Sequence, residues 1–137
     1  MGITTELPKQ AETELFMRQI FAEQELHVPH IDFEVGEIRL SKGVTQLASD
    51  QKIYPQFFLY RHFRRDWGDV GEDGKRANDE AVENGSKILS IYDMPVGEEE
   101  KLTICVVTEA EVPAQSFVKA HRSHTLVMTQ EELDGRK

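Results

Sequence analysis

Residues 61–70, RHFRRDWGDV, gather the residue types most able to do chemistry in this chain. The segment holds a histidine, three arginines, two aspartates and the only tryptophan. His62 and Asp66 stand four positions apart, so they share one face if the segment is helical. A histidine oriented by a carboxylate is a common acid–base pair, and it also supports metal ligands. The structural alternatives are a surface ion pair, or a histidine that ties the helix end to the next loop.

The predicted strands also carry polar residues. Ser90 and Tyr92 share one face of the predicted strand 87–94, and Thr108 and Glu109 close the next strand. Simple pairing around the PVGEEE turn brings Ser90 near Ile104 or Val106, and it brings Thr108 near residue 87. A serine becomes a nucleophile only when a base lies within hydrogen-bond reach. This pairing disperses the polar residues, so no triad is predicted.

The enzyme hypothesis therefore relies on His62 as the acid–base group, with Asp66 or Glu109 orienting it. Neither phosphate-binding glycine motif, GxxxxGK[ST] or GxGxxG, occurs in the sequence. We expect no cofactor, and an enzyme is the less favoured of the two readings.

No metal site is expected from the histidines or the cysteine. His27 and His30 form one H-x2-H pair, and His121 and His124 form another, both in or beside loops. A zinc site needs three or four ligands, and no cysteine pair stands near either. The single Cys105 lies inside the apolar run KLTICVVT, so it is expected to be buried rather than nucleophilic.

The arginines of the opening segment suggest a binding surface. Arg61, Arg64 and Arg65 are predicted on the outer face of a helix, beside Tyr60 and Trp67. Arginine, tyrosine and tryptophan dominate the residues that carry binding energy in protein interfaces. A solvated charged face is the alternative. The net charge of −9 makes nucleic acid an improbable partner, because nucleic-acid binders carry a basic face.

Periodicity and capping signals predict the helices. Pro55 suits a first helical turn, and Leu59, Phe63 and Trp67 recur every four residues, which places them on one buried face. Gly68 then offers a C-cap position. The predicted helices cover residues 8–26, a short stretch capped by Ser41, residues 55–67, and residues 72–84 with a stop at Asn84-Gly85.

A polar residue on the inner face of the last helix indicates an organised corner. Asn78 shares that face with Ala81, so its amide must be hydrogen-bonded, and the expected partners are backbone groups of residues 66–70. Asp69 or Glu72 is expected to cap this helix. The residues expected to hold the corner are His62, Asp66, Trp67, Gly68, Asp69, Asn78, Asp79, Ser90 and Tyr92.

The strands define the fold class. They are predicted at residues 37–40, 87–94, 102–108 and 124–129, and the long connection before the last strand is partly ordered by Phe117 and Val118. Consecutive strands joined by a hairpin predict a small antiparallel sheet of about four strands packed against three to four helices, the α+β class. At 137 residues the chain is expected to be a single domain, 1–137, with an N-terminal helical extension at 1–30 and a core at 36–133. The last residues, LDGRK, are expected to fray.

The order RH-x3-DWGDV, Asn78-Asp79, Gly85, KILSIY and VVTEA resembles a group of small bacterial proteins found on plasmids, phages and other mobile elements. Their core contains an RH..GDWG segment, ND, RILSAY and IITEADRS.TT. The resemblance covers about residues 37–133. In this chain Arg65 stands where a glycine precedes DWG, and the TEADRS link is expanded to TEAEVPAQSFVKAHRS. Some members are labelled restriction-modification subunits, but this chain is short and has no methyl-donor-binding fold.

The resemblance implies an accessory protein of a mobile genetic element and establishes no activity. We expect a small cytoplasmic protein that acts by protein–protein interaction, as a counter-defence inhibitor or a plasmid or phage maintenance factor. The polar N-terminus does not have the pattern of a signal peptide. No apolar run reaches the roughly 20 residues of a membrane span, so we expect no membrane partner. The alternatives are the His62 enzyme and a homodimeric structural module that pairs through a sheet edge or the N-terminal helix.

Overall fold

The computed structural model describes residues 33–95, 98 and 100–135, so the helix predicted at residues 8–26 lies outside the described residues. The elements follow in the order β1 (Glu37–Leu40), α2 (Lys42–Ser49), α3 (Pro55–Phe63), α4 (Glu72–Asn84), β2 (Ile88–Pro95), β3 (Lys101–Thr108), β4 (Glu111–Val112), β5 (His121–Arg122), β6 (His124–Thr129) and α5 (Gln130–Asp134).

The main sheet is mixed, with the strand order β1-β6-β3-β2. Strands β2, β3 and β6 pair antiparallel, as the hairpin signal predicts, and Met94 lies opposite Leu102. Strand β1 instead pairs parallel to β6, with Glu37 opposite His124. The α+β prediction of about four strands is confirmed, but the sheet is not wholly antiparallel. Because β1 and β6 come from opposite ends of the described chain, no local turn signal could predict their pairing.

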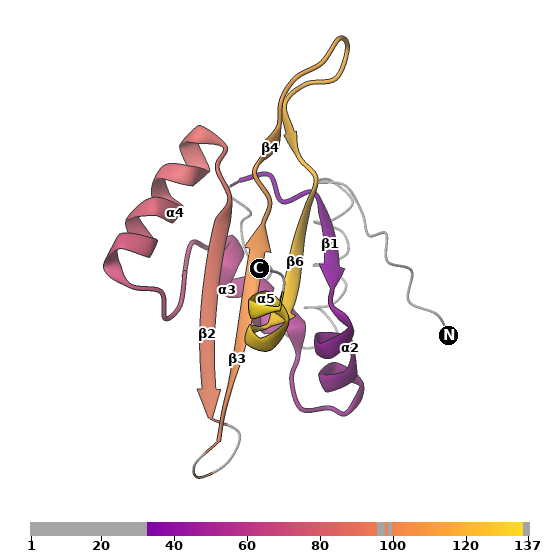
Figure 1. Cartoon of the computed structure of the whole chain (residues 1–137), viewed down its shortest axis with the longest axis vertical. Helices are drawn as coiled ribbons and strands as arrows, with labels where there is room; N and C mark the ends of the chain where they lie inside the picture. Colours follow the sequence, from indigo (N-terminus) through magenta and orange to yellow (C-terminus); the bar gives the residue numbers. More distant parts are fainter. Residues whose placement is uncertain (1–32, 96–97, 99, 136–137) are drawn as a thin grey trace.

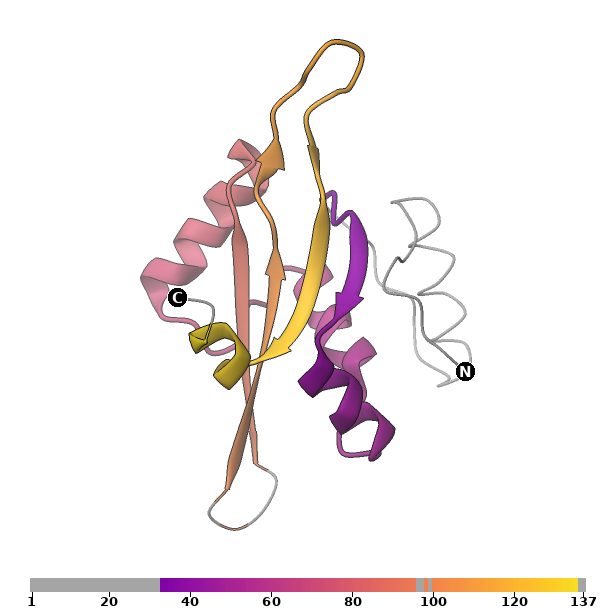
Figure 2. The same ribbon diagram turned by 45° about the vertical axis from the view of Figure 1, so that its right-hand side comes forward.

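The two faces of the sheet are covered unequally. Helices α2 and α3 lie on one face and α4 runs along the β2 edge, whereas the short α5 lies on the other face (Figures 1 and 2). Thr129 and Glu132 form a capping box that starts α5, so Leu133 and Asp134, the first two residues of the tail that is expected to fray, are helical. The core on the helix side includes Val35, Ile38, Val44, Phe63, Ile88 and Tyr92. The smaller cluster under α5 consists of Cys105, Val107 and Met128, packed against Leu89, Ile91, Leu126 and Leu133.

Helix α3 ends earlier than predicted, and this changes the geometry of the RHFRRDWGDV segment. Its last helical residue is Phe63 rather than Trp67, and Arg65 and Gly68 both have positive φ angles, 64° and 76°. Gly68 is therefore not the C-cap of α3. Leaving the helix lets the chain lie against β2, where the N–H of Ile91 donates to the Trp67 carbonyl at 3.2 Å. Trp67 remains buried in the core, as predicted, although it is off the helix.

The long connection before β6 forms a projecting hairpin, which we call the arm (residues 111–122). Strands β4 and β5 pair antiparallel at its base, and it extends beyond the body of the molecule (Figures 1 and 2). Phe117 is fully exposed and Val118 is 55% exposed. The prediction that these two side chains partly order the connection is wrong, because both are exposed. Backbone hydrogen bonds between Gln115 and Val118 close the tip instead.

Candidate functional site

A chain of buried polar side chains surrounds His62. The imidazole is completely buried, with Nδ1 2.6 Å from the Ser90 Oγ and Nε2 2.8 Å from the Thr108 Oγ1. Thr108 Oγ1 lies 2.7 Å from Thr125 Oγ1, and Thr125 donates to the Val35 carbonyl at 2.8 Å. These groups come from α3, β2, β3, β6 and the segment before β1. One polar chain therefore joins a helix to three neighbouring strands.

The number of hydrogens that these polar side chains can donate fixes the direction of each hydrogen bond between them. Thr125 has one hydroxyl hydrogen and uses it on the Val35 carbonyl, so Thr108 must donate to Thr125. Thr108 then accepts from His62 Nε2–H, and Nδ1 accepts from the Ser90 hydroxyl. His62 is thus the neutral Nε2–H tautomer, with both ring nitrogens satisfied.

The surroundings of His62 oppose protonation. Burial lowers its pKa to about 3, and the positive charge of Arg122 adds to that effect. The rings of Phe33 and Trp67 pack edge-on against the imidazole, with centroids 5.7 and 5.6 Å away. Because desolvation penalises the charged form, His62 stays neutral across the physiological pH range.

A serine that donates to a histidine is the arrangement of a nucleophile and its base. Here, however, Ser90, His62 and Thr108 are all fully buried, and none of them lines a groove described in the structure. A substrate could not reach the Ser90 oxygen in this conformation. The arrangement holds the core together rather than presenting a reactive atom.

The structure does not bring the three catalytic candidates together. Asp66 lies beyond the end of α3 and pairs with Arg61, with Nε 2.7 Å from Oδ2, so the predicted His62–Asp66 pairing is wrong. That guanidinium lowers the pKa of Asp66. Glu109 has its carboxylate 3.7 Å from the ammonium group of Lys87. The groups that do meet His62 are Ser90 and Thr108, because α3 crosses the strands at this point, which strand pairing alone does not reveal.

Asn78 clamps the outer edge of β2. Its Nδ2 donates to the Leu89 carbonyl at 2.7 Å, and the Leu89 N–H donates to its Oδ1 at 3.1 Å. The prediction of an inward, hydrogen-bonded amide is confirmed, but its partner is Leu89 rather than the loop 66–70. The amide thereby satisfies an edge residue that has no neighbouring strand on that side.

Residues 66–69, DWGD, lie along the same edge of β2 and satisfy further backbone groups there. The N–H of Asp69 donates to the Ile91 carbonyl, and its carboxylate accepts from the N–H of Asp93 at 2.8 Å. Gly68 lies against Ile91, where an added Cβ would collide with the backbone. Asp69 therefore does not cap α4, and neither does Glu72, because Gly71 occupies that position.

Two further contacts anchor this cover to the core. The Trp67 indole donates to the Asp79 carboxylate at 3.0 Å, and the Tyr92 hydroxyl donates to the Asp66 carbonyl at 2.7 Å. The predicted corner residues thus fall into two groups: residues 66–69, Asn78, Asp79 and Tyr92 close the β2 edge, whereas His62 and Ser90 belong to the buried polar chain.

Arg122 is a structural residue that the sequence did not indicate. Its side chain is buried at the base of the arm and donates to the carbonyls of Ala81, Ser86 and Glu109 at 2.8–2.9 Å. Ala81 lies in the last turn of α4, where the helix dipole favours a positive charge. No local signal distinguishes Arg122 from the other basic residues, because its acceptors are backbone atoms of distant segments.

The predicted arginine surface is only partly available. Trp67 is buried, and Arg61 is held by Asp66 and stacks on the Tyr92 ring at 4.5 Å. Arg64 stacks on Tyr60 at 5.1 Å and is exposed. The outer residues form what we call the α3 stripe, which consists of Tyr54, Phe57, Tyr60 and Arg64.

The remaining candidates, His121, His124 and Cys105, do not combine into a common site. His121 hydrogen-bonds the Lys119 carbonyl and His124 the Ser123 hydroxyl, and the described residues hold no cluster of three metal-ligating side chains. Cys105 is buried as predicted, and burial raises the pKa of its thiol to about 11.

Comparisons of the chain with protein families, curated proteins and solved structures gave no match. Among residues 33–95, 98 and 100–135, no helix has both the length and the apolar character needed to cross a membrane.

Proposed function

We propose that this protein acts by binding another protein and that the arm is the element that engages the partner. The supporting observation is the distribution of exposed apolar side chains over the described residues. Three of the five large ones, Val112, Phe117 and Val118, lie on the arm. A fully exposed phenylalanine on a projecting hairpin costs solvation free energy unless a partner covers it.

The arm is also built to present its tip. Arg122 ties its base to α4 and to the end of β3, so the hairpin leaves the body from a fixed point. Phe117 then stands on the part of the arm most distant from this anchor. An aromatic side chain carried in this way suits insertion into an apolar pocket, where such anchors supply much of the binding free energy.

The α3 stripe is the second candidate surface for the same function. Tyr54 and Phe57 are 49% and 41% exposed and contact each other edge-on. With Arg64 they retain the aromatic and arginine composition of a binding surface. On the motif resemblance alone, the partner belongs to the setting of a mobile element, as a host defence or maintenance component.

Site-specific photo-crosslinking tests the choice of surface. A photoreactive phenylalanine analogue is placed at Phe117 in one chain, at Phe57 in a second and at the exposed Glu131 in a third. Each is expressed in the source organism, irradiated, and analysed by mass spectrometry. We expect one protein to crosslink at position 117, and we expect this crosslink to disappear when Val118→Ser is added.

The other outcomes decide against the arm. Crosslinking of a specific protein only at position 57 would transfer the function to the α3 stripe. Crosslinks to a second copy of the chain would favour the homodimeric alternative. Equal, unspecific labelling at 117 and at the Glu131 control would refute binding through the arm.

A further inference from the structure

Strand β3 continues past the end of its neighbour β6. The last pair between them joins Ile104 to Thr129, after which the chain turns into α5. The first part of β3, from Lys101 to Thr103, pairs with β2 on one side only. About 10 Å of strand edge is therefore unpaired, at 3.3 Å for each residue.

The register shows which backbone groups face this free edge. The N–H of Glu109 donates to the His124 carbonyl, and antiparallel strands alternate their hydrogen-bonding residues. Val107 and Cys105 thus point their backbone groups toward β6, and Thr103 and Lys101 point theirs to the same side. On that side no group among the described residues hydrogen-bonds to either of them. Two donors and two acceptors are left for a partner.

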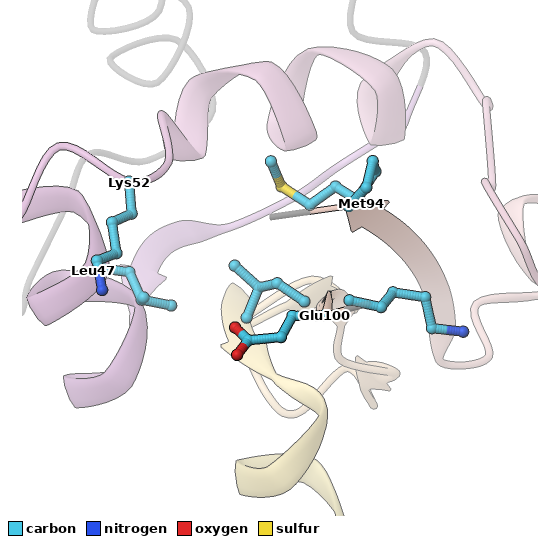
Figure 3. A pocket seen from close by; sticks show the side chains of 7 residues that line it. Leu47, Lys52, Met94 and Glu100 are labelled. Carbon is cyan, nitrogen blue, oxygen red and sulfur yellow. The ribbon is translucent and has the colours of Figure 1, made fainter. Parts of the chain in front are cut away.

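A groove runs beside this edge. One part, of about 780 Å³, has an apolar lining from Leu47, Met94 and Leu102 (Figure 3). A second part continues past Gly43 and Gln46 to the start of α5. Leu47 and Lys52 lie on the side of the groove opposite Met94 in Figure 3. The groove therefore follows the unpaired edge and offers an apolar surface to alternate side chains of an added strand.

The charges at the groove favour an acidic residue in that strand. Lys101 is 3.6 Å from Asp93, but Lys52 forms no ion pair with the described residues. Glu100 also lines this end, and Figure 3 shows its carboxylate apart from Lys52. The Lys52 ammonium, which is unpaired within the described part of the chain, can thus receive a carboxylate from a ligand.

We propose that the free edge of β3 at Lys101 and Thr103 binds an extended peptide segment of a partner protein. Its apolar side chains enter the groove at Leu47, and an acidic side chain meets Lys52. This is binding by strand addition, in which backbone hydrogen bonds give affinity and alternate side chains give specificity. The site is independent of the arm, so either can fail without the other.

A synthetic probe separates strand addition from simple apolar contact. The probe is the hexapeptide acetyl-Thr-Leu-Thr-Val-Thr-Asp-amide, in which Leu, Val and Asp share one face. When that face enters the groove and the peptide runs antiparallel to β3, as β6 does along the same side of the strand, the N–H groups of the three threonines point toward β3. N-methylation of the threonines should lower affinity about tenfold or more, because it removes those hydrogen bonds. N-methylation of Leu, Val and Asp is the matched control and should leave most of the affinity.

Two-dimensional NMR of the ¹⁵N-labelled full chain provides the readout. We expect probe-induced shifts at the amides of Lys101 and Thr103. Lys52→Glu should weaken binding of the probe about threefold to tenfold. It should leave nearly unchanged the affinity of a second peptide in which Asn replaces the terminal Asp of the probe. Lys119→Glu, on the arm, is the control variant and should affect neither peptide.

Each other result overturns the proposal. Equal affinities of the two N-methylated forms would exclude strand addition. Shifts of the same amides with protein concentration alone would identify a second copy as the occupant. If neither the probe nor a displayed library with the three inward positions varied yields a binder at this edge, the edge is not a peptide site.

Discussion

Replacing His62 by glutamine should flatten the dependence of stability on pH between pH 7.5 and pH 4.5. In the native state burial lowers the His62 pKa to about 3, whereas in the unfolded chain it returns to about 6.5. As the pH falls through this window the unfolded chain takes up a proton that the folded chain cannot. The free energy of unfolding therefore decreases from about pH 6.5 downward, until the native imidazole titrates near pH 3.

The size of the effect follows from the same pKa difference. One pKa unit corresponds to about 1.4 kcal/mol, so at pH 4.5, two units below the unfolded value, His62 alone removes about 3 kcal/mol. This is a large share of the 5–15 kcal/mol that stabilises a typical domain. Glutamine at position 62 keeps a donor and an acceptor for the neighbouring hydroxyls, but it has no charge to gain.

Urea unfolding of both chains at the two pH values provides the test. The carboxylates contribute equally to both chains, so the difference between the two pH-dependent losses isolates His62, with an expected value of about 3 kcal/mol. His121→Gln, at the base of the exposed arm, is the control and should lose as much stability as the unsubstituted chain. Equal losses in the His62→Gln chain would refute the reasoning. If that variant does not fold, an imidazole NMR signal of His62 that titrates above pH 5 would refute it.

Four further substitutions and one control test the packing at the β2 edge and at the base of the arm, each by urea unfolding at pH 7.5. Gly68→Ala should cost about 3 kcal/mol or more, because residue 68 has a positive φ and an added Cβ would collide with a β2 carbonyl. Gly71→Ala is the control; its added methyl meets open space, so it should cost less than about 1 kcal/mol. Asn78→Ala should cost about 2–3 kcal/mol and raise the tendency to aggregate, because it removes two hydrogen bonds and uncovers a strand edge. Arg65→Gly should stabilise the fold by about 1 kcal/mol, because Arg65 has a φ of 64°, and no gain would mean that its side-chain contacts offset the backbone strain. Arg122→Met should cost about 3 kcal/mol or more, since three carbonyls lose a buried donor, and a loss below about 1 kcal/mol would contradict that role.

Local signals in the sequence predicted the elements whose ends depend on nearby residues. Ser41 caps α2 through its side chain, and Gly85 ends α4 in the left-handed conformation, both as expected. The hairpin predicted around PVGEEE placed Ser90 near Ile104 or Val106, and the structure pairs it with Val106. These features rest on hydrogen bonds and turns within a few positions.

The tertiary structure alone decided the features that join distant segments. The α3 helix ends at Phe63 because hydrogen bonds to β2 replace those that another helical turn would form. Ser90 and Thr108 looked dispersed along a hairpin, and only the crossing of α3 places His62 between them. Sequence periodicity reports which face of an element is buried but not which element covers it. For that reason the RHFRRDWGDV segment, which has the composition of an active site, functions in the fold as the cover of a strand edge.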